Sequence, residues 1–172
     1  MTSVISLRVP AYIKDILELE GEQEYVNTNV LIHKILKKYV EWERFADKVR
    51  FLPVPRGSYK SMISLISEKD LMNLALENSE IKSLTVLRRG EYNIDTLLDT
   101  LTQWLIYSGL HIRYIESPEQ KLIISHDLGK NWSMYFEALV SNLIKDFDTR
   151  ITSTLHNENS LSIVLERPKR SI

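Results

Sequence analysis

The stretch SVISLRVP, residues 3–10, decides the fold of the first part of the chain. Its side chains alternate as those of a short strand do, with one apolar face and one mixed face. The apolar face holds Ile5, Leu7 and Val9, and the other holds Val4, Ser6 and Arg8. Pro10 ends this strand and suits the first turn of a helix, because its fixed φ and missing N–H cost nothing there.

Two helices are predicted after the strand. The first runs from about Ala11 to Glu20 with apolar positions Ile13, Ile16 and Leu17, and Gly21 is its expected stop. The second begins at Asn27, which is a good N-cap, and extends to about Lys48. Its apolar side chains repeat at i, i+3, i+4 spacing: Leu31, Ile32, Ile35, Leu36, Tyr39 and Val40. The stretch FLPVPRGS, residues 51–58, then predicts a linker because two prolines and a glycine fall close together.

A lone strand of about seven residues has unpaired backbone groups on both edges and cannot form a sheet by itself. The simplest solution is a homodimer, in which two copies pair their strands antiparallel and four helices bury the inward faces. Such a two-stranded ribbon has the right width for the major groove of B-DNA. We therefore expect double-stranded DNA as a partner, read by the outward side chains.

Two segments carry a family resemblance. ISLRVP followed by a helix, and YVNTNVLIHKILKKYV at residues 25–40, resemble the ribbon-helix-helix family of DNA-binding proteins over about residues 2–45. The resemblance implies base contacts from Val4, Ser6 and Arg8, and phosphate contacts from Asn27, Thr28 and Asn29. It implies a shared dimer core of Ile5, Leu7, Val9, Leu31, Ile35 and Leu36.

The chemistry of these positions fits DNA unevenly. The guanidinium of Arg8 matches the O6 and N7 acceptors of guanine, and the hydroxyl of Ser6 can donate or accept a hydrogen bond. Val4 can contact only a thymine methyl, and it departs from the polar residue that is usual at this position in the family. The start of the second helix would hold a phosphate through its N–H groups. Residues 1–50 contain eight Lys or Arg and eight Asp or Glu, so few phosphate contacts and a shallow salt dependence are expected.

Simpler interpretations of the same residues stay open. Arg8 could be a solvated edge residue, and Asn27 an ordinary helix cap. The lysines of the second helix, Lys34, Lys37 and Lys38, are typical of a solvated helix face.

The region 59–168 is predicted to be an α+β domain for dimerisation or sensing, with a mainly antiparallel sheet and three helices. Helices are expected over 68–78, where Ser67 and Asp70 form a start signal, over Asn93 to Ser108 with a stop at Gly109, and over 132–147. Strands are expected at 59–66 and 82–89, followed by a hairpin of HIRYIES and KLIISHD around Pro118-Glu119-Gln120 and a last hairpin of RITSTLHN and LSIVLER.

HDLGKNWSMYF, residues 126–136, is the most distinctive stretch of this region. It resembles a segment of uncharacterised archaeal proteins that append an α+β domain to a DNA-binding module. His126, Trp132 and Tyr135 are therefore candidates for ligand binding or domain packing, and packing in the core is the simpler reading of Trp132 and Tyr135.

Composition excludes several classes of protein. The chain has 172 residues, a formal net charge of −1 and no cysteine, which excludes a strongly basic nucleic-acid coat, disulfides and thiol catalysis. Neither a signal peptide nor a membrane span is expected, so the chain is predicted to be cytoplasmic. The four histidines lack the spacing of a zinc site, and no phosphate loop or nucleophile motif occurs, so no metal, no cofactor and no enzymatic activity are expected.

The sequence thus favours a sequence-specific, dimeric DNA-binding transcriptional regulator, with residues 1–50 as the DNA-binding and dimerisation domain. Two dimers side by side on DNA are consistent with the small footprint of one ribbon. Two alternatives stay open. One is an antitoxin of a toxin–antitoxin pair, and the other is a protein-interaction module that does not bind DNA.

Overall fold

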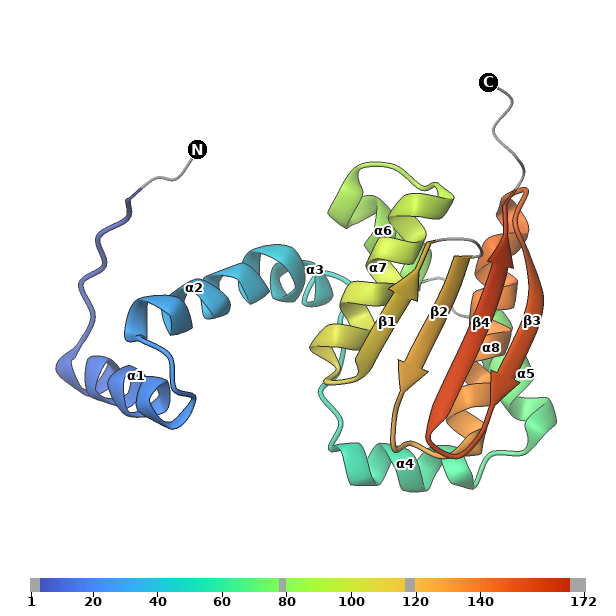
Figure 1. Cartoon of the computed structure of the whole chain (residues 1–172), viewed down its shortest axis with the longest axis horizontal. Coiled ribbons are helices and arrows are strands. Elements are labelled where there is room, and N and C mark those ends of the chain that lie inside the picture. The colour runs from blue at the N-terminus through green and yellow to red at the C-terminus, as the bar shows by residue number, and fades with distance from the viewer. Residues whose placement is uncertain (1–3, 78–79, 117–119, 168–172) are drawn as a thin grey trace. The chain divides into compact units, whose positions relative to one another are not determined.

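The computed structural model describes residues 4–77, 80–116 and 120–167 (Figure 1). Contacts within the chain divide it into two compact units, Met1–Arg44 and Phe45–Ile172, and each is described by itself. The division lies before the linker predicted over 51–58. No helix in the described ranges has the length and apolarity needed to cross a bilayer.

The first unit begins with residues 4–10, which form no helix or strand with described residues, and continues into α1 (Ala11–Gln23). The prediction that Gly21 stops this helix is wrong. Gly21 is buried inside it, and a Cβ there would lie 2.9 Å from the carbonyl oxygen of Val26. The helix ends two residues later, where the N–H of Val26 donates to the carbonyl of Gly21 and Tyr25 adopts a φ of 56°.

The second helix of this unit is α2 (Thr28–Lys38), which continues into the π-helix η1 (Tyr39–Glu43). The short α3 (Arg44–Ala46) follows, and the division between the units falls after its first residue. The predicted start at Asn27 is confirmed, because the Asn27 side chain accepts a hydrogen bond from the N–H of Val30 at 2.9 Å. The helical run ends at Ala46, close to the end expected at Lys48.

The second unit is α+β. Its sheet has the order β1-β2-β4-β3, every neighbouring pair is antiparallel, and both predicted hairpins are confirmed as strand pairs. The strands are β1 (His111–Ile115), β2 (Gln120–Ser125), β3 (Arg150–His156) and β4 (Ser160–Glu166). Of the turn predicted at Pro118-Glu119-Gln120, the first two residues lie outside the described residues, and Gln120 begins β2.

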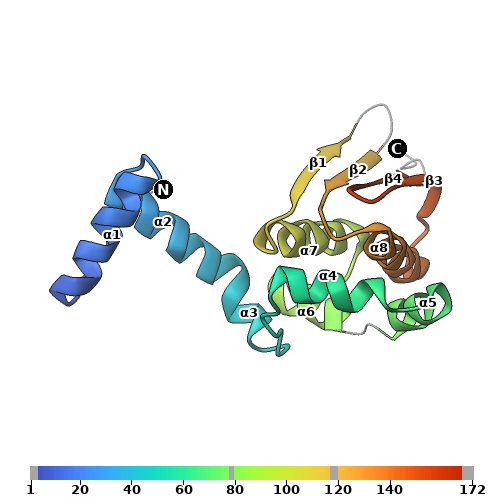
Figure 2. The same ribbon diagram turned by 90° about the horizontal axis from the view of Figure 1, so that it is seen from below.

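Five α-helices of this unit lie on one side of the sheet, in two layers (Figure 2). The inner layer is α7 (Ile94–Tyr107) and α8 (Lys130–Leu143), which η2 (Ile144–Asp146) extends. The outer layer is α4 (Arg56–Ser64), α5 (Glu68–Leu76) and α6 (Glu80–Arg89). Alternate strand residues such as Leu122, Ile124 and Ile163 are fully buried against the inner layer, where Phe136 of α8 is also fully buried.

The predictions of strands at 59–66 and 82–89 are wrong, because these segments form α4 and α6. In α6 the buried side chains of Ile81, Leu84 and Thr85 follow a helical spacing. A short apolar run such as this one fits a helix as well as a strand. The region therefore has five helices instead of the three expected. The other three helices are confirmed near their predicted positions, with Ser67 and Asn93 as side-chain caps.

Candidate nucleic-acid interface

Residues 4–9 present every side chain to solvent. The apolar set includes Ile5 at 72% exposure and Leu7 at 57%, and Val9 is also exposed. Ser6, Arg8 and Val4, the predicted base-contacting residues, are exposed as well. The segment pairs with none of the four strands of the described sheet.

The helical part of the predicted dimer core divides into two groups. Leu31 is 3% exposed and is the one buried residue of α2, whereas Ile35 and Leu36 on the same helix are exposed. Of the six residues assigned to the shared core, Leu31 alone is buried within a single chain. The other five are large apolar groups in contact with solvent.

Helix α1 has a second apolar face, which the sequence analysis missed. Ile13 and Leu17 are half-buried, but Tyr12, Ile16 and Leu19 are exposed. Their i, i+4, i+7 spacing places these three on one face of the helix. The sequence carries this spacing, and the predicted apolar face of Ile13, Ile16 and Leu17 shares only Ile16 with it.

The start of α2 holds the predicted phosphate-contacting residues together. Asn27 caps the helix through its side chain, which satisfies the N–H of Val30. Thr28 and Asn29 occupy the first two helical positions, and the first turn contains no acidic residue. The N–H groups of a first helical turn point away from the helix and favour an anion. The geometry is that of an ordinary cap, in which Thr28 is half-buried and Asn29 is exposed.

The lysines near this site pair mostly with carboxylates. Lys34 lies 2.8 Å from Glu24, and Lys38 lies 2.9 Å from Glu43. These pairs fit the interpretation of a solvated helix face. Arg8 has no such carboxylate partner recorded within the described ranges, and it stands on the segment whose alternate residues are apolar.

His126 lies in a closed hydrogen-bond network of the second unit. The N–H of Leu128 donates to its Nδ1 at 3.3 Å, so Nε2 carries the proton and donates to the Ser133 Oγ at 2.8 Å. Ser133 in turn donates to the carbonyl of Asn157 at 3.1 Å. The imidazole therefore cannot take a proton from Ser133 in this arrangement, and the pair is structural, not nucleophilic.

Burial lowers the pKa of His126, an effect that the nearby Asp127 carboxylate partly opposes. The other two candidates of this stretch, Trp132 and Tyr135, lie on α8. Trp132 is buried and its ring centroid lies 4.5 Å from that of His126. Tyr135 is half-buried beside Tyr59, and burial, with a smaller contribution from Tyr135, raises the pKa of Tyr59 to about 12. All three candidates therefore take part in packing.

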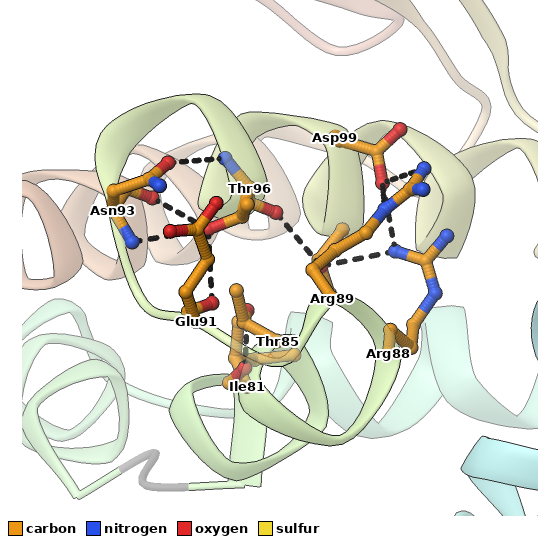
Figure 3. Close-up of polar contacts among 9 residues, drawn as sticks. Ile81, Thr85, Arg88, Arg89, Glu91, Asn93, Thr96 and Asp99 are labelled. Carbon is orange, nitrogen blue, oxygen red and sulfur yellow. Dashed lines mark hydrogen bonds and ion pairs between the residues drawn. The ribbon is translucent and has the colours of Figure 1, made fainter.

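A charged network joins α6 to α7 (Figure 3). Arg88 and Arg89 both pair with one oxygen of Asp99, at 3.1 Å and 2.7 Å, and Arg88 also donates to Thr100 at 3.0 Å. The Arg88 side chain is only 3% exposed. The network holds α6 against α7. Within it two guanidinium groups share one carboxylate, so it has an excess positive charge, which Arg89, the exposed member, carries at the surface. No cluster of metal-binding side chains occurs among the residues the structure describes.

Comparisons with protein-family models, with curated proteins and with solved structures give no match for this chain. The geometry of the chain alone therefore carries the functional argument.

Proposed function

We propose that this chain is a dimeric, sequence-specific DNA-binding transcriptional regulator of the ribbon-helix-helix type. In this proposal residues 4–9 of two copies pair as an antiparallel ribbon, and α1 and α2 of both copies enclose a common core. One observation carries the proposal: residues 4–9 form no helix or strand with described residues, and the large apolar side chains that alternate along them, Ile5, Leu7 and Val9, are exposed.

The first unit lacks a sufficient core of its own. Units of about 40 residues bury too little surface to be stable alone without a metal, a disulfide or a partner. This chain has no cysteine, and the described residues form no metal cluster. A second copy would cover Ile35 and Leu36 together with the ribbon, and would also give the exposed face of α1 a partner.

Pairing the apolar faces directs the opposite side chains outward. Val4, Ser6 and Arg8 would then face base edges in the major groove, with Arg8 suited to guanine. The Thr28 and Asn29 N–H groups at the start of α2 would bind a phosphate and fix the orientation of the ribbon. Twofold symmetry predicts a palindromic or repeated site.

The second unit would contribute dimerisation or sensing to this regulator. Its folded α+β architecture is unlike the short, disordered tail typical of antitoxins, so it does not favour that alternative. A protein-interaction role would use the same apolar surface without DNA, and the experiment below separates the two.

The test is selection of bound sequences from a random double-stranded DNA pool by the purified full-length chain. We expect enrichment of a twofold-symmetric site, and Arg8→Ala should abolish the sequence preference while the protein remains dimeric. Lys14→Ala is the matched control, because it also removes one exposed cation, which pairs with Glu18 on α1. A stable dimer that enriches no sequence would contradict DNA binding and support the protein-interaction role.

A further inference from the structure

A cavity of about 400 Å³ opens in the second unit. The 51–54 segment, the first turns of α4 and the last turns of α7 form its walls, and Leu128 and Trp132 complete them. This volume lies within the range of sites that bind small molecules. The sequence predicts a linker over 51–58 and no binding site there.

Three aromatic rings that line the cavity, Phe51, Trp104 and Trp132, belong to one ring cluster, in which the buried Phe136 lies behind the lining. Phe51 meets Trp104 edge to face with centroids 6.1 Å apart, and Trp104 lies 6.0 Å from Phe136. Trp132 stacks on Phe136 at 5.1 Å, with an angle of 15° between the rings. Since Phe136 and Trp132 are buried, these rings are already held in place. A flat ligand would therefore contact an ordered surface and lose little binding energy to ordering it.

The charge at this site points to an uncharged ligand. Arg56 is the one charged side chain in the described lining, and its Nε donates to Asp127 at 2.7 Å. Its Nη1 also lies 3.4 Å from the Gly109 carbonyl. The Asp127 carboxylate already balances the guanidinium. An anionic ligand would have to compete with Asp127 for Arg56, and the rest of the lining is uncharged and mostly apolar, so an uncharged ligand is favoured.

Two lining residues of the 51–54 segment are apolar and lie in contact with solvent. Leu52 is 83% exposed, and Val54 is also exposed. A ligand in the cavity would cover part of this surface, and Ser108 adds a hydroxyl group to the same lining. We propose that the cavity binds an uncharged, flat and largely apolar small molecule. The binding site stands on the second unit alone, and only its role as an effector site rests on the proposed function.

The test uses two dyes that differ by one charge. The full-length chain is titrated with N-phenyl-1-naphthylamine, which is uncharged, and with its sulfonated analogue 8-anilinonaphthalene-1-sulfonate. We expect a saturable rise in the fluorescence of the uncharged dye at one molecule per chain, with weaker binding of the anionic dye by about tenfold or more. Equal or tighter binding of the anionic dye, or no saturable binding, would overturn the proposal.

Variants then locate the bound dye. Val54→Phe and Ser108→Phe each fill the cavity from its exposed edge, and each should weaken binding of the uncharged dye by about tenfold. Leu65→Phe is the control, because Leu65 is exposed on the C-terminal end of α4 and does not line the cavity. Dye binding that survives both filling variants, or that is lost in Leu7→Ala instead, would contradict this site. If the DNA selection enriches no sequence, the proposed regulator function is contradicted, but the proposal of a ligand site, which the dye titration tests, is unaffected.

Discussion

Leu7 offers the clearest quantitative test of the shared core. Its side chain is 57% exposed in the single chain, and the proposed ribbon would bury that surface. Full burial of a leucine contributes roughly 1.5–3 kcal/mol, so this fraction contributes roughly 1–1.5 kcal/mol per copy. Leu7→Ala removes most of this contribution from both copies and leaves a cavity. The dimer should therefore weaken by roughly 2–3 kcal/mol, or roughly 30- to 150-fold in its dissociation constant.

The assay is sedimentation equilibrium of the full-length chain over a wide concentration range. Leu65→Ala is the control, because Leu65 is also an exposed leucine but lies outside residues 4–9, α1 and α2, which form the proposed shared core. The dissociation constant of the Leu65→Ala dimer should stay within about twofold of the wild-type value. A Leu7→Ala dissociation constant equal to that of the wild type would refute the reasoning. So would an equal weakening by Leu65→Ala.

Three further predictions concern stability. Burial lowers the pKa of His126, so the folded state favours the neutral imidazole. The stability that the neutral imidazole provides is present above about pH 6.5 and is lost as the pH falls below that value. The difference in unfolding free energy between wild type and His126→Gln should therefore narrow from pH 7.5 to pH 5, and a difference that stays constant over this range would contradict the prediction. Asp99→Ala removes the carboxylate that pairs with the buried Arg88 and should cost about 3 kcal/mol in urea unfolding, whereas Arg89→Ala, at the exposed partner, should cost under about 1 kcal/mol. Tyr25 is exposed and has a positive φ, which glycine adopts without strain. Tyr25→Gly should therefore raise the free energy of unfolding by about 1 kcal/mol, and a melting temperature below that of the wild type would contradict this.

The sequence predicted the α+β class of the second unit because its C-terminal strands alternate over five to seven residues. It failed at α4 and α6 for a physical reason. Short apolar runs fit a strand and a helix alike, and only packing decides between them. In α4 the apolar residues Tyr59 and Ile63 also follow the helical i, i+4 spacing, and Ile63 is buried in the core.

The candidate sites differ in how far local sequence can predict them. The Asn27 cap was predictable because its partner Val30 is three residues away. The His126 network was not, because it depends on the carbonyl of Asn157, which the fold brings close from a distant hairpin. The cavity beside Trp104 was not predictable either, because its lining residues come from segments that are far apart in the sequence. The role of residues 4–9 depends on a second chain, so it stays a prediction.

The most direct measurement of the central claim is a distance between two copies of the chain. The protein has no cysteine, so Ser6→Cys can carry a single spin label on the side of the segment proposed to face away from the core. Paired strands of six residues span roughly 20 Å, and double electron–electron resonance should therefore give one narrow distance within roughly that range. The signal should disappear when labelled chains are mixed with excess unlabelled protein. A dimer by sedimentation whose labels show no such short distance would mean that residues 4–9 do not pair.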